Sequence, residues 1–120
     1  MTEHQLANTL NRCLKDALGG SYATPADYEA NAPVPARAAY VEILDISEVT
    51  PGMGPYSVEA TFFISPPPPQ DPTAALQTAL ESCADLHLAG WQEIRSTGTD
   101  VDEKDKRISF YIQLQFYLLP

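Results

Sequence analysis

Two cysteines and two histidines are the residues of this chain best suited to nucleophilic or metal chemistry. Cys13 and Cys83 could act as nucleophiles only as accessible thiolates beside a histidine. Both instead occupy apolar positions in segments with helical periodicity, which favours reduced core thiols. His4 and His87 have no second ligand at metal-binding spacing, so solvated histidines are the better interpretation. We therefore expect no catalytic residue, cofactor or metal here.

An acidic run from Asp100 to Asp105 begins like a calcium-binding loop. The EF-hand pattern needs glycine at its sixth position and a bidentate glutamate at its twelfth, where this chain has Asp105 and Tyr111. Lys104 occupies the fifth position, which should supply a ligand. The run is better explained as a charged hairpin tip. Nucleotide-binding, serine-hydrolase and zinc-protease motifs are also missing, so the sequence predicts a protein that is not an enzyme.

The remaining functional signal is a set of uncharged and aromatic side chains on predicted strands. Tyrosine and glutamine alternate with apolar residues in the last strand, on a face without lysine or arginine. Tyrosine is enriched at protein interfaces because it buries a large area and keeps a polar group. A plain solvated sheet face is the alternative. The candidate interface residues, including two tyrosines from a long loop, are Tyr22, Tyr28, Glu59, Thr61, Phe63, Tyr111, Gln113, Gln115 and Tyr117.

Length and charge narrow the class of protein further. The chain has 120 residues, 44% of them hydrophobic, which suits one domain with one core. Seven basic and 16 acidic residues give a net charge of −9, which argues against nonspecific binding to nucleic acid or to an anionic membrane. No apolar run approaches the ~20 residues that span a bilayer. The first residues have no basic or apolar signal region, so we do not expect secretion.

Two segments have the apolar spacing of amphipathic helices. The first follows Thr2, which is suited to cap a helix, and ends at a pair of glycines. The second opens with Asp71 as the N-cap and Pro72 at the first helical position. Its apolar stripe predicts a helix that continues until Gly90.

Four segments have strand patterns, arranged as two hairpins. In residues 38–49 the apolar positions change phase, which predicts either a bulge near Ile43-Leu44 or two partly covered faces. Residues 56–64 alternate strictly and predict a strand with one buried face. Residues 91–101 and 108–118 form the second predicted hairpin, and the last of these segments alternates without a fault.

The predicted order is therefore α-β-β-α-β-β. It indicates an α+β two-layer sandwich, with a mainly antiparallel four-stranded sheet and two helices on one face. A single domain covers residues 1–120. Residues 21–35 form a long loop, which is either a simple connection or a functional segment. The proline-rich connector at 66–70 is interpreted as a rigid link between strand and helix rather than as a docking peptide.

This pattern resembles the tail terminator (tail completion) proteins of long-tailed bacteriophages, which are small acidic α+β proteins of similar length. The points of resemblance are an opening amphipathic helix and a strand at 35–41 introduced by proline. A second strand at 56–64 ends in the proline run before the helix capped by Asp-Pro. A charged loop at 100–106 precedes the final alternating strand at 108–118. The similarity is one of pattern over nearly the whole chain.

The resemblance implies a structural role in the virion. Members of this family form a homohexameric ring on the last ring of tail-tube protein, where they stop tube polymerisation and present a surface to the head-completion protein. The ring would lie at the head-proximal end of the tail, after assembly in the host cytoplasm. DNA would pass through its lumen only in transit, which an acidic wall suits because it would not grip the duplex.

Two other interpretations remain open at this stage. One is a different phage head–tail connector or minor tail protein. The other is a small oligomeric ligand-binding α+β domain, in which the sheet face forms the floor of a cleft.

Overall fold

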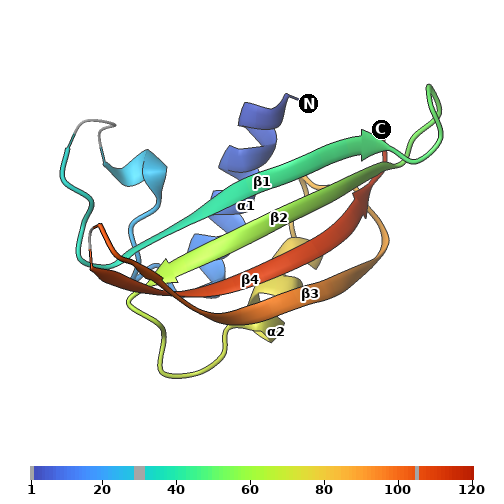
Figure 1. Ribbon diagram of the computed structural model, residues 1–120. Helices are drawn as coiled ribbons and strands as arrows, with labels where there is room; N and C mark the ends of the chain where they lie inside the picture. The colour runs from blue at the N-terminus through green and yellow to red at the C-terminus, as the bar shows by residue number, and fades with distance from the viewer. Residues whose placement is uncertain (1, 29–31, 105) are drawn as a thin grey trace.

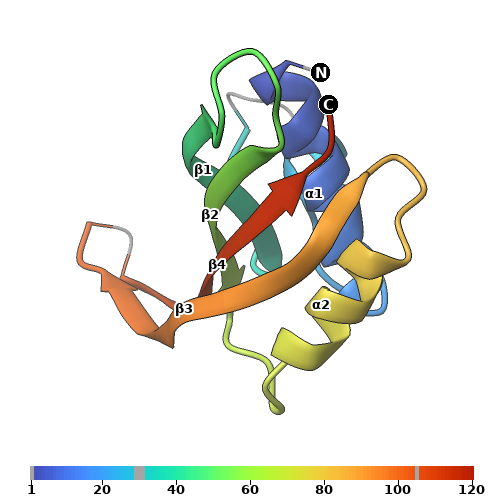
Figure 2. The ribbon, with the colours of Figure 1, turned by 90° about the vertical axis from the view of Figure 1, so that its right-hand side faces the viewer.

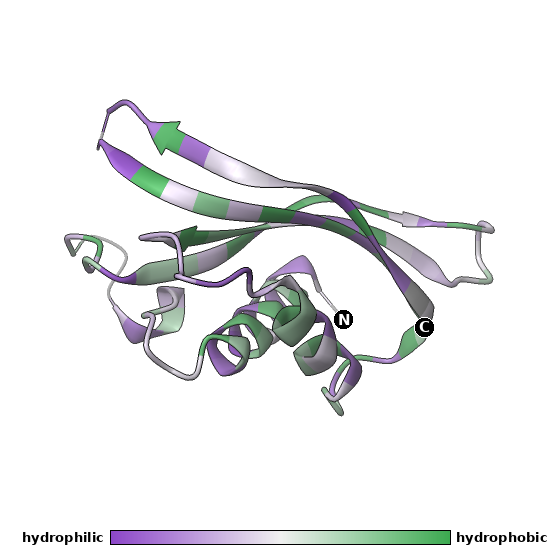
Figure 3. Ribbon diagram, turned by 90° about the horizontal axis from the view of Figure 1, so that it is seen from below, coloured by the Kyte–Doolittle hydropathy of each residue, from purple (hydrophilic) through white to green (hydrophobic). Residues whose placement is uncertain are grey.

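The computed structural model describes residues 2–28, 32–104 and 106–120 and has the predicted α-β-β-α-β-β order. Both helices lie on one face of a single four-stranded sheet, so the α+β two-layer architecture is confirmed (Figures 1 and 3). The elements are α1 Glu3–Ala17, β1 Ala38–Glu48, β2 Tyr56–Ser65, α2 Thr73–Glu81, β3 Leu88–Asp102 and β4 Arg107–Leu118, with a short 3-10 turn at Pro25–Asp27.

The strands lie in the order β1-β2-β4-β3, and all neighbours are antiparallel. Each hairpin therefore contributes one central strand and one edge strand. The predicted phase change in β1 is a bulge, because the register shifts between Ile43 and Asp45. A second shift lies between Ile94 and Ser96 in β3. Figure 2 shows the far end of the β3–β4 hairpin projecting beyond the helices.

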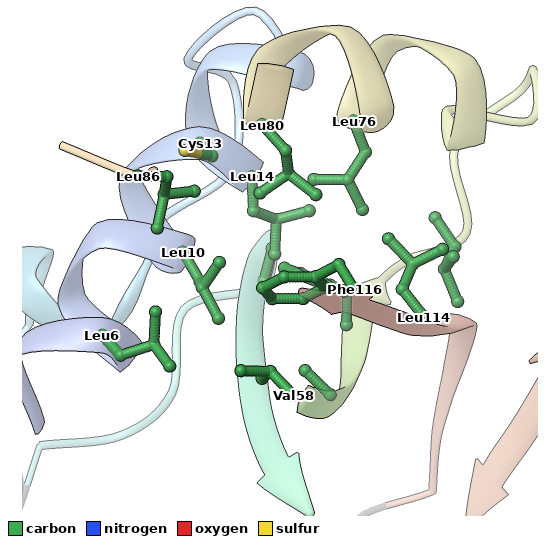
Figure 4. Close-up of a cluster of buried hydrophobic side chains, with 14 of the residues drawn as sticks. Leu6, Leu10, Cys13, Leu14, Val58, Leu76, Leu80, Leu86, Leu114 and Phe116 are labelled. Atoms are coloured by element: carbon green, nitrogen blue, oxygen red, sulfur yellow. The ribbon is translucent and has the colours of Figure 1, made fainter. Parts of the chain in front are cut away.

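The core lies between the helices and the inner face of the sheet. Alternate residues of β2 and β4, such as Phe62 and Phe116, are fully buried against leucines of α1 and α2 (Figure 4). Phe110 belongs to the apolar alternation of residues 108–118, which predicts that it is buried, but it is only partly buried. It lies toward the projecting end of β4, where neighbouring Ile108 is 50% exposed. The alternation of β4 therefore continues past the part of the sheet that the helices cover.

Helix α1 begins as its sequence predicts. The N–H of Gln5 donates to Oγ1 of Thr2 at 3.1 Å, and the N–H of Thr2 donates to Oε1 of Gln5 at 2.8 Å. This reciprocal capping box satisfies two amides that a helix start otherwise leaves unpaired. Further along α1, the buried Asn11 accepts a hydrogen bond at 2.9 Å from the N–H of Val41 in β1. A helix side chain thus closes part of the edge of the sheet.

Helix α2 is shorter than predicted. Pro72, rather than the predicted Asp71, occupies the N-cap, although the carboxylate of Asp71 accepts the N–H of Thr73 at 2.9 Å. The helix begins at Thr73 and ends at Glu81, so the predicted continuation to Gly90 is also wrong. After Glu81 the chain turns so that Leu86 enters the core. Gly90 lies inside β3 with φ of +101°. The need to bury Leu86 and to start β3 outweighs the apolar stripe that predicted a longer helix.

Candidate functional site

The face of the sheet opposite the helices, here called the outer face, carries most of the candidate interface residues. Strand register places a continuous set of polar and aromatic side chains on it. Figure 3 shows both helices on the other side, and no described helix covers this face. Its members are Tyr40, Glu42, Asp45 and Ser47 of β1, Ser57, Glu59, Thr61 and Phe63 of β2, Tyr111, Gln113, Gln115 and Tyr117 of β4, and Glu93, Ser96, Gly98 and Asp100 of β3.

The side chains of the outer face are packed against one another. Tyr111 lies over Gly98 of β3, so a Cβ atom built on this glycine would be 2.9 Å from the tyrosine oxygen. The same hydroxyl lies 3.3 Å from Oγ of Ser96. The aromatic rings of Tyr40 and Phe63 are stacked, with centroids 5.1 Å apart. With these contacts, Tyr111 and Phe63 are each half-buried.

The predicted interface residues of β2 and β4 include no lysine or arginine, but two arginines lie beside them: Arg107 at the start of β4 and Arg95 in β3. Arg95 lies at the bulge in β3 and donates a hydrogen bond to Oε1 of Gln115. The amide of Gln115 donates to Oγ of Ser57 at 3.0 Å, so this glutamine bridges its two neighbouring strands. Arg95 also pairs with Glu93 at 3.5 Å. Gln115 is therefore held by contacts within the sheet.

Several of the predicted residues of β2 and β4 are partly exposed on the outer face. Gln113 and Glu59 are half-buried, as is Tyr117. Thr61 is 8% exposed, so little of it is available to a partner. The surrounding acidic residues make the face negative, in keeping with the net charge of the chain. Gln113 is the predicted residue nearest the middle of the face, because it pairs with Thr61 on one side and Ser96 on the other.

The predicted interface role of Tyr22 is wrong, because this side chain belongs to the core. It is 4% exposed, and its hydroxyl donates to the carbonyl of Pro66 at 2.9 Å. The guanidinium of Arg37 lies 4.5 Å from the centre of its ring. The loop continues past Tyr22 to an isolated bridge between Ala23 and Ala38. The first part of this loop thus stabilises the monomer. Loop residues follow no apolar periodicity, so the sequence does not distinguish a buried tyrosine there from an exposed one.

Tyr28, the second loop tyrosine, lines a hollow of ≈ 430 Å³ at one end of the outer face. The hollow lies where the loop, β1, β2 and the β3–β4 hairpin meet, and the stacked rings of Tyr40 and Phe63 also line it. Asp100 and Asp102 also line it from the end of β3, and their carboxylates accept the N–H groups of Val101 and Lys104, each at 3.0 Å. Sequence reasoning missed Tyr40 and both aspartates as a group, because they lie on β1 and β3, which are far apart in the sequence.

Arg107 anchors the loop beside this hollow. One of its guanidinium nitrogens donates to the carbonyls of Pro35 at 2.5 Å and Ala36 at 3.0 Å. Charge at the hollow also affects the ring of Tyr40. Burial raises the pKa of Tyr40, and the neighbouring carboxylates of Glu42 and Asp102 add to this increase.

Cys13 has the environment of a core thiol, and Cys83 is partly buried against the same core. Cys13 is buried, and its pKa is raised to about 12, first by burial and then by the neighbouring thiol of Cys83. Such a thiol is protonated at neutral pH, whereas a nucleophile needs the thiolate. Both histidines are exposed, and His4 lies 3.4 Å from the amide of Asn8.

The described part of the chain was compared with the side-chain arrangements that hold metal ions and with the helix lengths that cross a membrane. Residues 2–28, 32–104 and 106–120 contain no group of three or more histidine, cysteine, aspartate or glutamate side chains arranged to hold a metal ion. The acidic run lies at the end of β3 and the turn that follows, and Asp105 is outside the described residues. No described helix is long and apolar enough to cross a membrane.

Comparison with known proteins adds no relationship to this picture. The chain matches no family of known proteins, and no curated protein matches its sequence. The candidate site is thus defined by its geometry alone: an open, acidic, tightly packed sheet face with a hollow at one end.

Proposed function

We propose that this protein is a structural assembly protein that works by self-association, and specifically a tail terminator of a long-tailed phage. The observation that carries the proposal is the outer face, where half-buried tyrosine and glutamine side chains lie on a sheet that no described helix covers. Such side chains favour a protein partner over water. The resemblance in element order and proline-marked connections supplies the specific role.

A ring needs two different surfaces on each subunit, because its contacts are head-to-tail. The outer face is one candidate. The projecting end of the β3–β4 hairpin is the other, since its helix-side face exposes Val101 and Ile108, at 55% and 50%. The two surfaces differ in chemistry, which supports a closed ring over a two-fold dimer. The net charge of −9 suits a ring whose lumen only passes DNA.

The proposal is tested by electron microscopy of tails from the encoding phage with this gene deleted. A terminator predicts overlong tube polymers that fail to join heads. Tails of normal, uniform length that still join heads would refute the proposal. Tails of normal length that fail to join heads would instead indicate the alternative, a different head–tail connector.

Complementation then tests the outer face itself. Gln113→Arg places a charge at the middle of this face and should fail to restore tail length, because an unpaired charge is costly at an interface. Gln70→Arg makes the same change at an exposed position of the proline-rich connector and should restore it. Thermal melts of both purified variants separate loss of assembly from loss of folding. Full restoration by Gln113→Arg would exclude the centre of the outer face from the ring contact.

A small oligomeric ligand-binding domain is the second candidate, and the hollow beside Tyr40 favours it. The stoichiometry of the protein distinguishes the two. A hexameric ring, free or formed on tail tubes, supports the terminator, whereas a stable dimer that does not associate with tubes supports the ligand-binding domain.

A further inference from the structure

We propose that the free edge of β1, from Ile43 to Glu48, binds an extended segment of a partner protein in which apolar and basic side chains alternate. This segment would add one strand to the sheet beside β1. The inference does not rest on the tail role, because it uses only groups within one chain. Its basis is a row of outward backbone groups, with an apolar hollow on one side of it and two carboxylates on the other.

The first half of β1 has its edge closed by other parts of the chain. The N–H of Ala39 donates to the carbonyl of Ala23 at 2.8 Å, and the N–H of Val41 donates to Oδ1 of Asn11 at 2.9 Å. Alternate residues of an antiparallel strand direct their backbone groups the same way, so those of Ile43 also point away from β2. Figure 1 shows α1 crossing behind this part of β1, whereas the arrowhead end of β1 extends beyond the helix.

The second half of β1 has similar outward groups, but nothing in the described chain receives them. After the bulge, Ile46 and Glu48 pair with Val58 and Tyr56, which belong to the same alternate set of β2 as the partner of the valine bound by α1. The N–H and C=O groups of Ile46 and Glu48 therefore point away from the sheet. Within the described residues, no other strand or loop pairs with this stretch, and every residue from Leu44 to Glu48 is exposed. Such an unpaired edge is a template for an added strand.

A mainly apolar hollow of ≈ 450 Å³, here called the helix-side hollow, lies beside this edge on the side of the helices. Ile46 lines it and shares its face of the sheet with the buried Val58. An added strand would place alternate side chains next to Ile46, on the side of this hollow. The acidic residue of the lining, Asp85, is already paired with Arg12 at 2.7 Å, so apolar side chains suit the hollow best. Its apolar lining includes Leu6, Ile46, Tyr56, Leu86, Leu118 and Leu119.

The opposite side of the same edge is acidic. Glu42 and Asp45 are exposed on the outer face of β1, and neither forms an ion pair within the described residues. Lysine or arginine at the outward positions of an added strand would lie opposite these carboxylates, which is a favourable cross-strand arrangement. A second copy of β1 would instead bring carboxylates close to one another. The charge therefore favours a basic partner segment and opposes pairing between two copies of this edge.

The test is an NMR titration of the intact protein with three peptides. The probe is acetyl-Lys-Val-Lys-Val-Lys-Val-Lys-amide. The second peptide carries N-methyl groups on its valines, because a valine opposite Ile46 would exchange backbone hydrogen bonds with it. The third peptide has glutamate in place of each lysine. We expect the probe to shift the amides of residues 43, 46 and 48, to slow their hydrogen exchange, and to bind at least about tenfold more tightly than either analogue.

Each other outcome counts against a stated part of the proposal. Absence of these shifts with the probe would overturn the edge as a binding site. Equal binding of the N-methylated peptide would overturn strand addition, and equal binding of the acidic peptide would overturn the basic partner. Shifts of the same amides with protein concentration, in samples without peptide, would identify a second copy as the occupant and overturn the assignment to a partner protein.

One variant and one matched control make the test specific. Asp45→Lys reverses the charge beside the edge and should weaken the probe about three- to tenfold at low salt, with a smaller effect at high salt. Asp16→Lys makes the same change at an exposed position near the other end of α1 from the helix-side hollow, and should leave binding unchanged. The NMR spectrum of each free variant checks that the fold is retained. Equal effects of the two substitutions would reduce binding to general surface charge and overturn the proposal.

Discussion

Asn11 provides a sharp test of how the sheet edge is closed. Its Oδ1 accepts the N–H of Val41 at 2.9 Å, and this N–H points away from β2, at the free edge of β1. Asn11 is 8% exposed, so water has little access to the bond. Asn11→Ala would leave a shielded backbone donor without its acceptor. The expected cost is about 1–3 kcal/mol, the usual penalty for an unsatisfied buried polar group.

A matched control comes from the same helix. Asn8 lies one turn earlier in α1, is exposed, and makes only a 3.4 Å side-chain contact with His4. Asn8→Ala and Asn11→Ala gain the same intrinsic helix propensity, so that term cancels in their difference. We expect Asn8→Ala to change stability by less than about 0.5 kcal/mol.

The assay is urea unfolding of the wild type and both variants, combined with amide hydrogen exchange at Val41. Asn11→Ala should lower the urea midpoint at an unchanged slope and speed exchange at Val41 more than at neighbouring amides. A loss in Asn11→Ala no larger than that in Asn8→Ala, with exchange at Val41 unaltered, would refute the argument that this side chain seals the edge.

Three further predictions concern packing and titration. Phe116→Ala should cost about 3–5 kcal/mol in a chemical melt because Phe116 is fully buried, and Phe110→Ala should cost clearly less; equal losses would contradict the partial exposure of Phe110. Gly98→Ala should cost about 1–3 kcal/mol through overpacking against Tyr111, and a double-mutant cycle with Tyr111→Ala should recover most of the loss; an additive cycle would show that the two residues are uncoupled. The folded Cys13 thiol has a pKa of about 12 against an ordinary 9.0, so the unfolded chain loses its proton first and stability falls as pH rises above 9. This group should lower the free energy of unfolding by about 1.4 kcal/mol per pH unit. Between pH 8.5 and 10.5, the free energy of unfolding of Cys13→Ala should therefore fall less with pH than that of the wild type. The same fall in both proteins would contradict the raised pKa of Cys13.

Strand periodicity predicted most of this fold because alternation directly records which face of a strand is buried. The change of phase in β1 was visible for the same reason, but the pairing with β2 was needed to decide between a bulge and two partly covered faces. The end of α2 was not visible. Ala84 and His87 fit a helical stripe, but only the tertiary structure shows that Leu86 must turn into the core. The spacing of apolar residues within one segment does not show whether a longer α2 or the burial of Leu86 is more stable.

The candidate site was harder to predict than the fold. Tyr22 and Tyr28 lie in one loop with no period, yet the first enters the core and the second lines a hollow. Arg95 reaches Gln115 through a bulge whose position depends on pairing with another strand. The hollow combines a loop, a first hairpin and a second hairpin that are far apart in the sequence. Such groupings depend on the register between paired strands. The pattern within one segment does not show which strand it pairs with or in which register.

The position of β2 and β4 at the centre of the sheet has a consequence during synthesis on the ribosome. Phe62 pairs with Ile112, so the central seam cannot form until the last strand has been made. Phe62 and Ile112 are about 50 residues apart in the sequence, which at ordinary elongation rates corresponds to about 3–10 s. Throughout that interval the first hairpin presents the future β4-binding edge of β2 unpaired, which is the geometry that invites wrong partners. The pairing is also non-local, and such topologies fold slowly. The order of synthesis therefore leaves the β4-binding edge of β2 open to wrong pairing until β4 has been made.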